Sequence, residues 1–227
     1  MNKYGDLLKK IDFFLKLATS DKGESGSKFS VEKLKKICHN YYTLYINKII
    51  GYKLAKHMIS YANKFLPELG YGKARIVYKL TPASVLKIAK NDFGLIQNKT
   101  ELDIFTNPET APMVTKIFDY DTHDNWIIAE YVIPLKSEEE FKELTGMVFS
   151  SFYDAISFSL DEYDSYSKGP YIKTNIDNHE LVLNTIKTVK ATGLIWSELE
   201  YIGHWGKTAD GRIVVLDYGF REDDQIH

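Results

Sequence analysis

The spacing of the hydrophobic positions changes near Leu69 and divides the sequence into a helical part and a mixed part. Residues 4–19 carry leucine, isoleucine and phenylalanine at helical spacing, which predicts an amphipathic helix. After a polar, glycine-rich stretch, Ser30 is a good N-cap for a long second helix that extends to Pro67 and kinks or splits near Gly51. We expect this apolar hairpin to pack on the domain that follows it, and a partner protein is the alternative.

From Leu69 onward the pattern is that of short strands followed by helices. Strands are predicted at 74–80, 84–89, 113–120 and 126–132, and helices at 96–106, 137–145, 148–160 and 178–195. The last predicted element is a hairpin whose turn contains Asp210-Gly211, a favoured tight-turn pair. Strands before helices indicate an α+β protein.

The composition is that of an ordinary globular protein, with 44% hydrophobic and 26% charged residues. The formal net charge of −2 does not favour nucleic acid as a partner. No apolar run reaches the roughly 20 residues that span a bilayer, and the N-terminus lacks the layout of a signal peptide. Cys38 is the only cysteine, so a disulfide within the chain and a thiolate zinc cluster are excluded. We expect a cytoplasmic protein that does not bind membranes.

One lysine lies in the middle of an apolar strand. In the run Val85-Leu86-Lys87-Ile88-Ala89, alternation places Lys87 on the same face as the smaller Val85 and Ala89. A buried lysine is costly without an anionic partner, so a ligand is expected to lie beside Lys87, between these smaller side chains. The alternative is a lysine on an edge strand whose ammonium group reaches water.

A second charge ends another apolar run. Asp217 follows Ile213–Leu216 and is followed closely by Gly219, so its carboxylate can leave the end of a strand toward a metal or phosphate. The alternative is a turn-forming aspartate that accepts from its own backbone. Glu101, on the helix expected after Lys87, can hold that lysine, while Asp217 holds Mg²⁺ against the same phosphates.

In this order the motifs resemble those of protein kinases, and more closely those of small kinase-like proteins of tailed bacteriophages and prophages. Lys87 and Glu101 resemble the lysine and glutamate of kinases, and Asp217-Tyr218-Gly219 is similar to the Asp-Phe-Gly metal site. The motifs that resemble those of the phage-type proteins are R-x-V-Y, V-L-K-x-A-x-N, G-x-x-Q-N-x-x-E and W-G-x-T-x-D-G-R-x-V-L-D-Y-G. The resemblance covers residues 69–220 and does not reach the N-terminal helices.

Two further segments fit the same resemblance. Glu130 to Val132, at the end of an apolar strand, is similar to the hinge that binds the adenine ring through backbone groups. Gly70 and Gly72 resemble an abbreviated glycine-rich loop. The resemblance therefore implies that ATP and Mg²⁺ are the cofactors of this chain.

The implied fold is a truncated protein-kinase-like fold of the α+β class. An N-terminal helical extension occupies 1–68, an N-lobe with an antiparallel sheet occupies 69–135, and a small helical C-lobe with a terminal hairpin occupies 136–227. Only eight residues follow Gly219, whereas protein kinases have an activation segment and a peptide-binding helical platform there.

The proton chemistry of a kinase is where the chain departs from the pattern. Counting back from Asp217 places the catalytic aspartate near Leu199, and no His-Arg-Asp sequence is present. Glu198 or Glu200 beside it is a candidate general base. His204 falls at the place of the metal-binding asparagine, where it is a candidate ligand. The alternative is that His204 and Trp205 form a packing motif.

We expect a pseudokinase or scaffold that binds a host or virion protein through its N-terminal helices and retains nucleotide binding. The missing catalytic motif favours this hypothesis. The alternative is an active ATP- and Mg²⁺-dependent phosphotransferase. Either protein would work in the cytoplasm of the host cell, and the scaffold also in association with the virion.

Overall fold

The computed structural model describes residues 30–42, 49–161, 163, 170–194, 199–216 and 218. The chain forms two compact units, and the helix predicted at 4–19 lies outside the described residues. Unit 1 comprises the described residues of 1–98 and 118–129, and unit 2 comprises those of 99–117 and 130–227. The three-part division drawn from the sequence stays a prediction.

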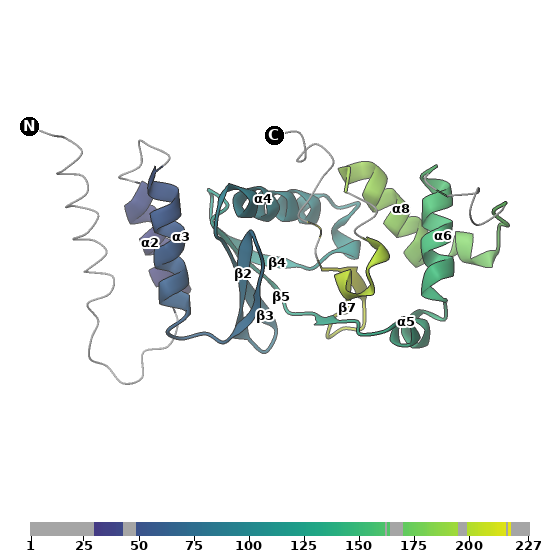
Figure 1. Ribbon diagram of the computed structural model, residues 1–227, viewed down its shortest axis with the longest axis horizontal. Coiled ribbons are helices and arrows are strands. Elements are labelled where there is room, and N and C mark those ends of the chain that lie inside the picture. The colour runs from purple at the N-terminus through teal and green to yellow at the C-terminus, as the bar shows by residue number, and fades with distance from the viewer. Residues whose placement is uncertain are drawn as a thin grey trace, which may run out of the picture. The chain divides into compact units, whose positions relative to one another are not determined.

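Unit 1 consists of a five-stranded sheet and two helices (Figure 1). The helices are α2 (Val31–Tyr42) and α3 (Ile49–Ala62), and the strands are β1 (Glu68–Tyr71), β2 (Arg75–Thr81), β3 (Ser84–Ala89), β4 (Ile117–Tyr120) and β5 (Trp126–Glu130). The strand order is β1-β2-β3-β5-β4, and β2 pairs antiparallel with both β1 and β3. Strands β1 and β4 are therefore the edges of the sheet, and β3 lies in its interior.

Helices α2 and α3 pack on one face of this sheet. The α2 helix is capped as predicted, because Ser30 Oγ accepts a hydrogen bond from the backbone N–H of Lys33 at 3.2 Å. The buried cluster between helices and sheet comprises Leu34, Ile37, Leu54, Met58, Tyr61, Ala62, Ile76, Tyr78, Leu86, Ile88, Trp126 and Ile128. The expectation that the apolar face of this segment packs on the following domain is confirmed. The helical segment ends at Ala62, earlier than the predicted end near Pro67.

Helix α4 (Asp92–Thr106) begins before the predicted start at residue 96. The side chain of Asn91 explains the difference, because its Oδ1 accepts a hydrogen bond from the backbone N–H of Gly94 at 3.1 Å. Gly94 also lies so close to the sheet that a Cβ at this position would be 2.3 Å from the backbone oxygen of Ala74. Glycine is thus what allows the first turn of α4 to approach the strands.

Unit 2 combines helices with a small three-stranded sheet. Its helices after α4 are α5 (Glu138–Thr145), α6 (Phe149–Ser159) and α8 (Glu180–Thr192), and its strands are β6 (Ile133–Pro134), β7 (Trp205–Lys207) and β8 (Ile213–Val215). The three helices confirm the predicted ones apart from their end residues. The strands pair antiparallel in the order β6-β7-β8, so the predicted terminal hairpin is present as β7 and β8. Ala111–Met113 is a 3-10 turn, so the strand predicted at 113–120 is shorter than expected.

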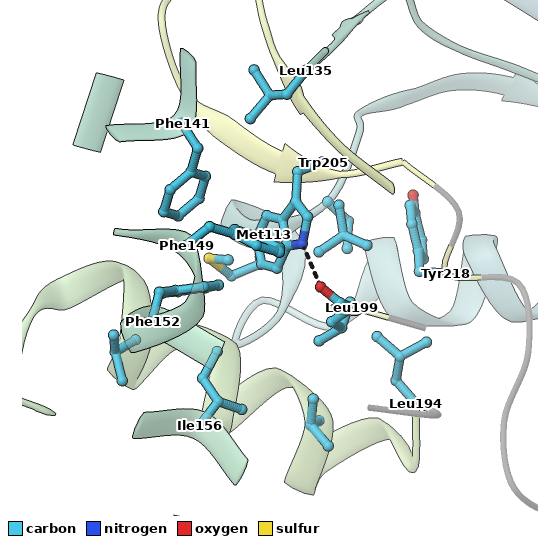
Figure 2. Close-up of a cluster of buried hydrophobic side chains, with 14 of the residues drawn as sticks. Met113, Leu135, Phe141, Phe149, Phe152, Ile156, Leu194, Leu199, Trp205 and Tyr218 are labelled. Atoms are coloured by element: carbon cyan, nitrogen blue, oxygen red, sulfur yellow. Dashed lines mark hydrogen bonds between the residues drawn. The ribbon is translucent and has the colours of Figure 1, made fainter. Parts of the chain in front are cut away.

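The core of unit 2 is aromatic (Figure 2). The ring of Phe152 lies 5.1 Å from that of Phe141 and 5.2 Å from that of Trp205, the latter nearly perpendicular. Trp205 is fully buried, and its Nε1 donates a hydrogen bond to the backbone oxygen of Leu199 at 2.9 Å. Both units therefore have cores of their own, within a mixed α/β architecture that contains an antiparallel sheet. None of the helices among the described residues has the length and apolarity that crossing a membrane requires.

Replacing Gly94 with alanine is expected to destabilise unit 1 by about 1–3 kcal/mol, because the new methyl group would overlap the backbone of Ala74 and Ala89. Urea denaturation followed by circular dichroism measures the change. Gly70→Ala is the matched control, since a Cβ there would meet nothing within 4 Å. Equal stability of the Gly94→Ala and Gly70→Ala variants would contradict this packing.

The stability of unit 1 should fall in alkaline solution because of Tyr78. Burial raises the pKa of Tyr78 from 10.0 to about 12, and its hydroxyl donates to Asn63 Oδ1 at 2.7 Å. The unfolded chain then loses this proton at lower pH than the folded chain, so the contribution is complete below pH 10 and is lost as the pH rises toward 12.

Tyr78→Phe should remove this loss, which is about 1.4 kcal/mol per pH unit within the window. The measurement is urea unfolding of both proteins at a series of pH values from neutral to alkaline. Parallel stability curves for the wild type and the variant would show that the hydroxyl is not protected.

Candidate functional site

Lys87 lies in the interior of the unit 1 sheet. All six residues of β3 are buried, and Lys87 itself is only 8% exposed. The register pairs Val77 with Lys87 and Ile76 with Ile88, so the ammonium group projects from the face opposite to α2 and α3. The predicted alternation is confirmed. The interpretation as an edge-strand lysine is wrong, because β2 and β5 flank β3.

Gly70 and Gly72 belong to the β1 strand and to the turn before β2. The turn is tight, since the N–H of Gly72 donates to the backbone oxygen of Arg75 at 2.9 Å. The ammonium group of Lys90 also donates a hydrogen bond to the backbone oxygen of Gly72 at 2.8 Å. Neither glycine has a positive φ, and neither is crowded at the Cβ position. Their predicted role beside phosphates therefore stays a prediction.

Helix α4 carries the polar residues of the G-x-x-Q-N-x-x-E motif. Asn98 is fully buried; its Oδ1 accepts from Arg75 at 3.3 Å and its Nδ2 donates to the backbone oxygen of Asp124 at 2.7 Å. This amide ties the helix to strand β2 and to the β4–β5 turn, which gives the asparagine a structural role. It also explains the arginine of R-x-V-Y, which the sequence singled out without assigning it a contact.

Glu101 follows on the same helix and is completely buried. A buried carboxylate is costly unless opposite charge or hydrogen-bond donors compensate it. Glu101 belongs to unit 2 and Lys87 to unit 1, so the pairing of the two stays a prediction.

Glu130 is part of a charged cluster in unit 2. Its carboxylate accepts from Arg212 Nη2 at 2.8 Å and from the backbone N–H of Lys116 at 3.3 Å. The side chains of Glu130 and Arg212 are 11% and 27% exposed, so this ion pair is partly shielded from water. The sequence indicated the backbone of this segment as an adenine-binding hinge and missed the ion pair. The only signal for it is an arginine directly after the hairpin turn.

The hairpin between β7 and β8 holds Arg212 in place. Thr208 Oγ1 accepts from the backbone N–H of Arg212 at 2.8 Å and donates to Asp210, and Gly211 takes the left-handed conformation with φ of 86°. The hydrogen bond from Thr208, together with the charge of Arg212, holds the pKa of Asp210 well below its usual range. The residues of T-x-D-G-R therefore build a turn that aims an arginine at Glu130.

Val132, the other end of the predicted hinge, is buried beside the start of the same hairpin. A Cβ added at Gly206 would lie 2.6 Å from Cγ1 of Val132 and 2.9 Å from the backbone oxygen of Ile133. Gly206 thus allows β7 to pair closely with β6. The contact of Val132 with an adenine ring stays a prediction.

The segment around the expected catalytic loop is divided between core and surface. Leu199 is 1% exposed and belongs to the aromatic core (Figure 2). Glu200, the next residue, is exposed. The ring of His204 packs edge-on against Tyr201 at 5.1 Å, and its backbone oxygen accepts from the N–H of Leu216. The interpretation of Trp205 as a packing residue is confirmed.

Asp217 and Glu198 lie outside the described residues. Tyr218, the middle residue of the motif that resembles Asp-Phe-Gly, is fully buried, and its hydroxyl donates to the backbone oxygen of Thr115 at 3.1 Å. Among the described residues, no group of three or more histidine, cysteine, aspartate or glutamate side chains could hold a metal ion. The metal-binding roles of Asp217 and His204 therefore stay predictions.

Comparison with known proteins adds little to this geometry. No protein-family model and no curated protein matches the chain. A solved streptomycin-ATP-APH(2")-IIa ternary complex is similar with a TM-score of 0.35 and 14% identity over 71% of this chain and 69% of that one. SAICAR-synthase from Saccharomyces cerevisiae complexed with SAICAR is similar with a TM-score of 0.34 and 11% identity, over 67% and 73%. TM-scores this low carry no argument about function.

Arg212→Lys is expected to destabilise unit 2 by about 1–3 kcal/mol, because a lysine cannot bond Glu130, Asp210 and the backbone oxygen of Pro112 together. Chemical denaturation measures the loss. Lys187→Met is the control, since its ion pair with Glu109 is about half exposed on both sides and should contribute within about 0.5 kcal/mol. A loss no larger than that of the control would show that the cluster is only a surface feature.

Proposed function

We propose that this chain is a small protein-kinase-like protein of the tailed-phage type that binds an adenine nucleotide and serves as a scaffold. The observation that carries nucleotide binding is the buried Lys87 in the interior of the sheet. Protein kinases carry their phosphate-binding lysine on strand β3, and Lys87 lies on the third strand of unit 1. A buried ammonium group is a strong site for phosphate oxygens because little water screens it.

The remaining nucleotide contacts are assigned from the sequence resemblance. By this resemblance Glu101 is the proposed partner of Lys87, and its side chain is buried. Backbone groups of Glu130 to Val132 bind the adenine ring, and Gly70 and Gly72 lie beside the phosphates. Asp217, with His204 as a second ligand, holds Mg²⁺ when the nucleotide is bound. The metal would neutralise the phosphate charge there.

The scaffold role is supported by the residue at the expected position of the catalytic base. That position falls near Leu199, which is packed in the unit 2 core and carries no titratable group. Its backbone oxygen is used by Trp205, so the segment is held by packing rather than prepared for proton transfer. We propose that the bound nucleotide stabilises a surface that recruits a host or virion protein through the N-terminal helices, in the host cytoplasm or on the virion.

One observation supports the alternative of an active phosphotransferase. Glu200 is exposed beside Leu199, so its carboxylate can reach a substrate hydroxyl in solution. Glu198 is the other candidate base. In this alternative Lys87 and Asp217 keep the same roles, and only the use made of the nucleotide differs.

The test is the thermal stability of the full chain with and without ATP and Mg²⁺. At a nucleotide concentration ten times Kd, binding should raise the melting temperature by about 3–6 °C. Lys87→Met should abolish this shift, whereas Lys99→Met, at an exposed lysine of α4, should keep it. A wild-type protein that shows no shift at millimolar ATP would overturn nucleotide binding.

Transfer of the γ-phosphate distinguishes the two uses of the nucleotide. The scaffold proposal expects no transfer to candidate host proteins or small molecules above the rate in buffer. The phosphotransferase alternative expects transfer by wild type. Asp217→Ala should abolish this transfer, and Glu200→Gln or Glu198→Gln should strongly reduce it. That result would overturn the scaffold role and establish the phosphotransferase.

A further inference from the structure

Unit 1 contains a cavity that the nucleotide proposal does not use. Its volume is about 650 Å³, and it is lined by α3, the turn after α3, strand β1 and the residues that follow β3. Ile76 of strand β2 is also one of its lining residues. Because Ile76 and Lys87 lie on opposite faces of the sheet, this cavity and the Lys87 site are separate. We refer to it as the α3 cavity.

The side chains that line the α3 cavity carry more positive than negative charge. Lys56 and Lys64 approach it from α3 and the following turn, and Lys90 approaches it from the end of β3. Glu68 is the single acidic residue of the lining. Three ammonium groups thus accompany one carboxylate in the lining, which gives the hollow a positive potential.

The rest of the lining suits a small polar ligand. Ser60, Asn63 and Asn91 provide hydroxyl and amide groups, and Tyr71 is 66% exposed at the rim. Lys90 is held in position, since it donates to the oxygen of Gly72 at 2.8 Å and lies 3.6 Å from the centre of the Tyr71 ring. The volume falls within the range of about 300–1,000 Å³ that small-molecule sites occupy.

We infer that the α3 cavity binds a small phosphorylated anion. Lysines bind phosphate groups as point charges, and lysines from separate elements that converge on one hollow match a ligand with several negative charges. Ile59 and Ile76 add apolar side chains to the lining, and charge interactions are stronger where less water surrounds them. The cavity adds a second anion site to the chain and does not depend on nucleotide binding at Lys87.

Inorganic tripolyphosphate is the probe, titrated into the full chain by calorimetry at an ionic strength of about 0.1 M. Wild type should show saturable binding that weakens as salt is added. Lys56→Gln/Lys64→Gln should weaken it at least about tenfold. The same double variant should have a melting temperature close to that of wild type without the probe, because both lysines are exposed.

Two controls test whether the probe binds in the α3 cavity itself. Lys36→Gln/Lys99→Gln removes the same charge from exposed positions outside the cavity and should leave the affinity unchanged. Because the proposed nucleotide site would also attract tripolyphosphate, wild type and Lys56→Gln/Lys64→Gln are both titrated again in the Lys87→Met background, where the same loss of about tenfold is expected. Absence of saturable binding at millimolar probe, an equal loss in the two double variants, or no effect of Lys56→Gln/Lys64→Gln in the Lys87→Met background would each overturn the inference.

Discussion

Strand β3 is buried along its whole length, and the arrangement of unit 1 follows from what its two faces require. Leu86 and Ile88 on one face need apolar cover, which α2 and α3 provide through the core that they share with the sheet. On the other face Lys87 needs compensation for its charge, because a buried ammonium group loses its hydration. One short strand therefore links the packing of the helices to the position of Lys87, on which the proposed nucleotide site depends.

Several residues of the kinase-like motifs have packing or hydrogen-bonding roles in this fold. Gly94 lets α4 approach the strands, Asn98 ties that helix to β2 and to a turn, and the residues from Thr208 to Arg212 shape a hairpin. These residues are explained without a ligand. Lys87 and Glu101 are buried charged residues, and burying a charge lowers stability unless another charge or a ligand compensates it. They are the residues on which a functional interpretation depends.

The two proposed anion sites of unit 1 differ in the number of positive charges and in how far water screens them. Lys87 is a single charge in a buried strand, where weak screening makes one partner decisive. The lysines of the α3 cavity are several charges at the surface, where each contributes little and convergence provides the strength. A nucleotide and a second phosphorylated ligand could thus bind the same unit on separate faces of its sheet.

Hydrophobic spacing and turn residues predicted most of the secondary structure correctly. The strand around Lys87, the three helices of unit 2 and the hairpin at Asp210-Gly211 all follow from spacing and turn chemistry. The predicted first residues of α4 and β4 were wrong. A side-chain hydrogen bond of Asn91 decides the start of α4, and the 3-10 turn that contains Pro112 delays the start of β4. A hydrogen bond of a single residue is enough to move an end, and it leaves no periodic signal.

The sequence by itself determined which residues are exceptional: a lysine in an apolar strand and an aspartate that ends another apolar run. Only the tertiary structure decided that β3 is an interior strand, that Lys87 faces away from α2 and α3, and that Arg212 pairs with Glu130. It also brought Lys56, Lys64 and Lys90 to one cavity. Spacing encodes the faces of single elements, whereas strand order and contacts between residues far apart in the chain arise only when those faces pack against one another.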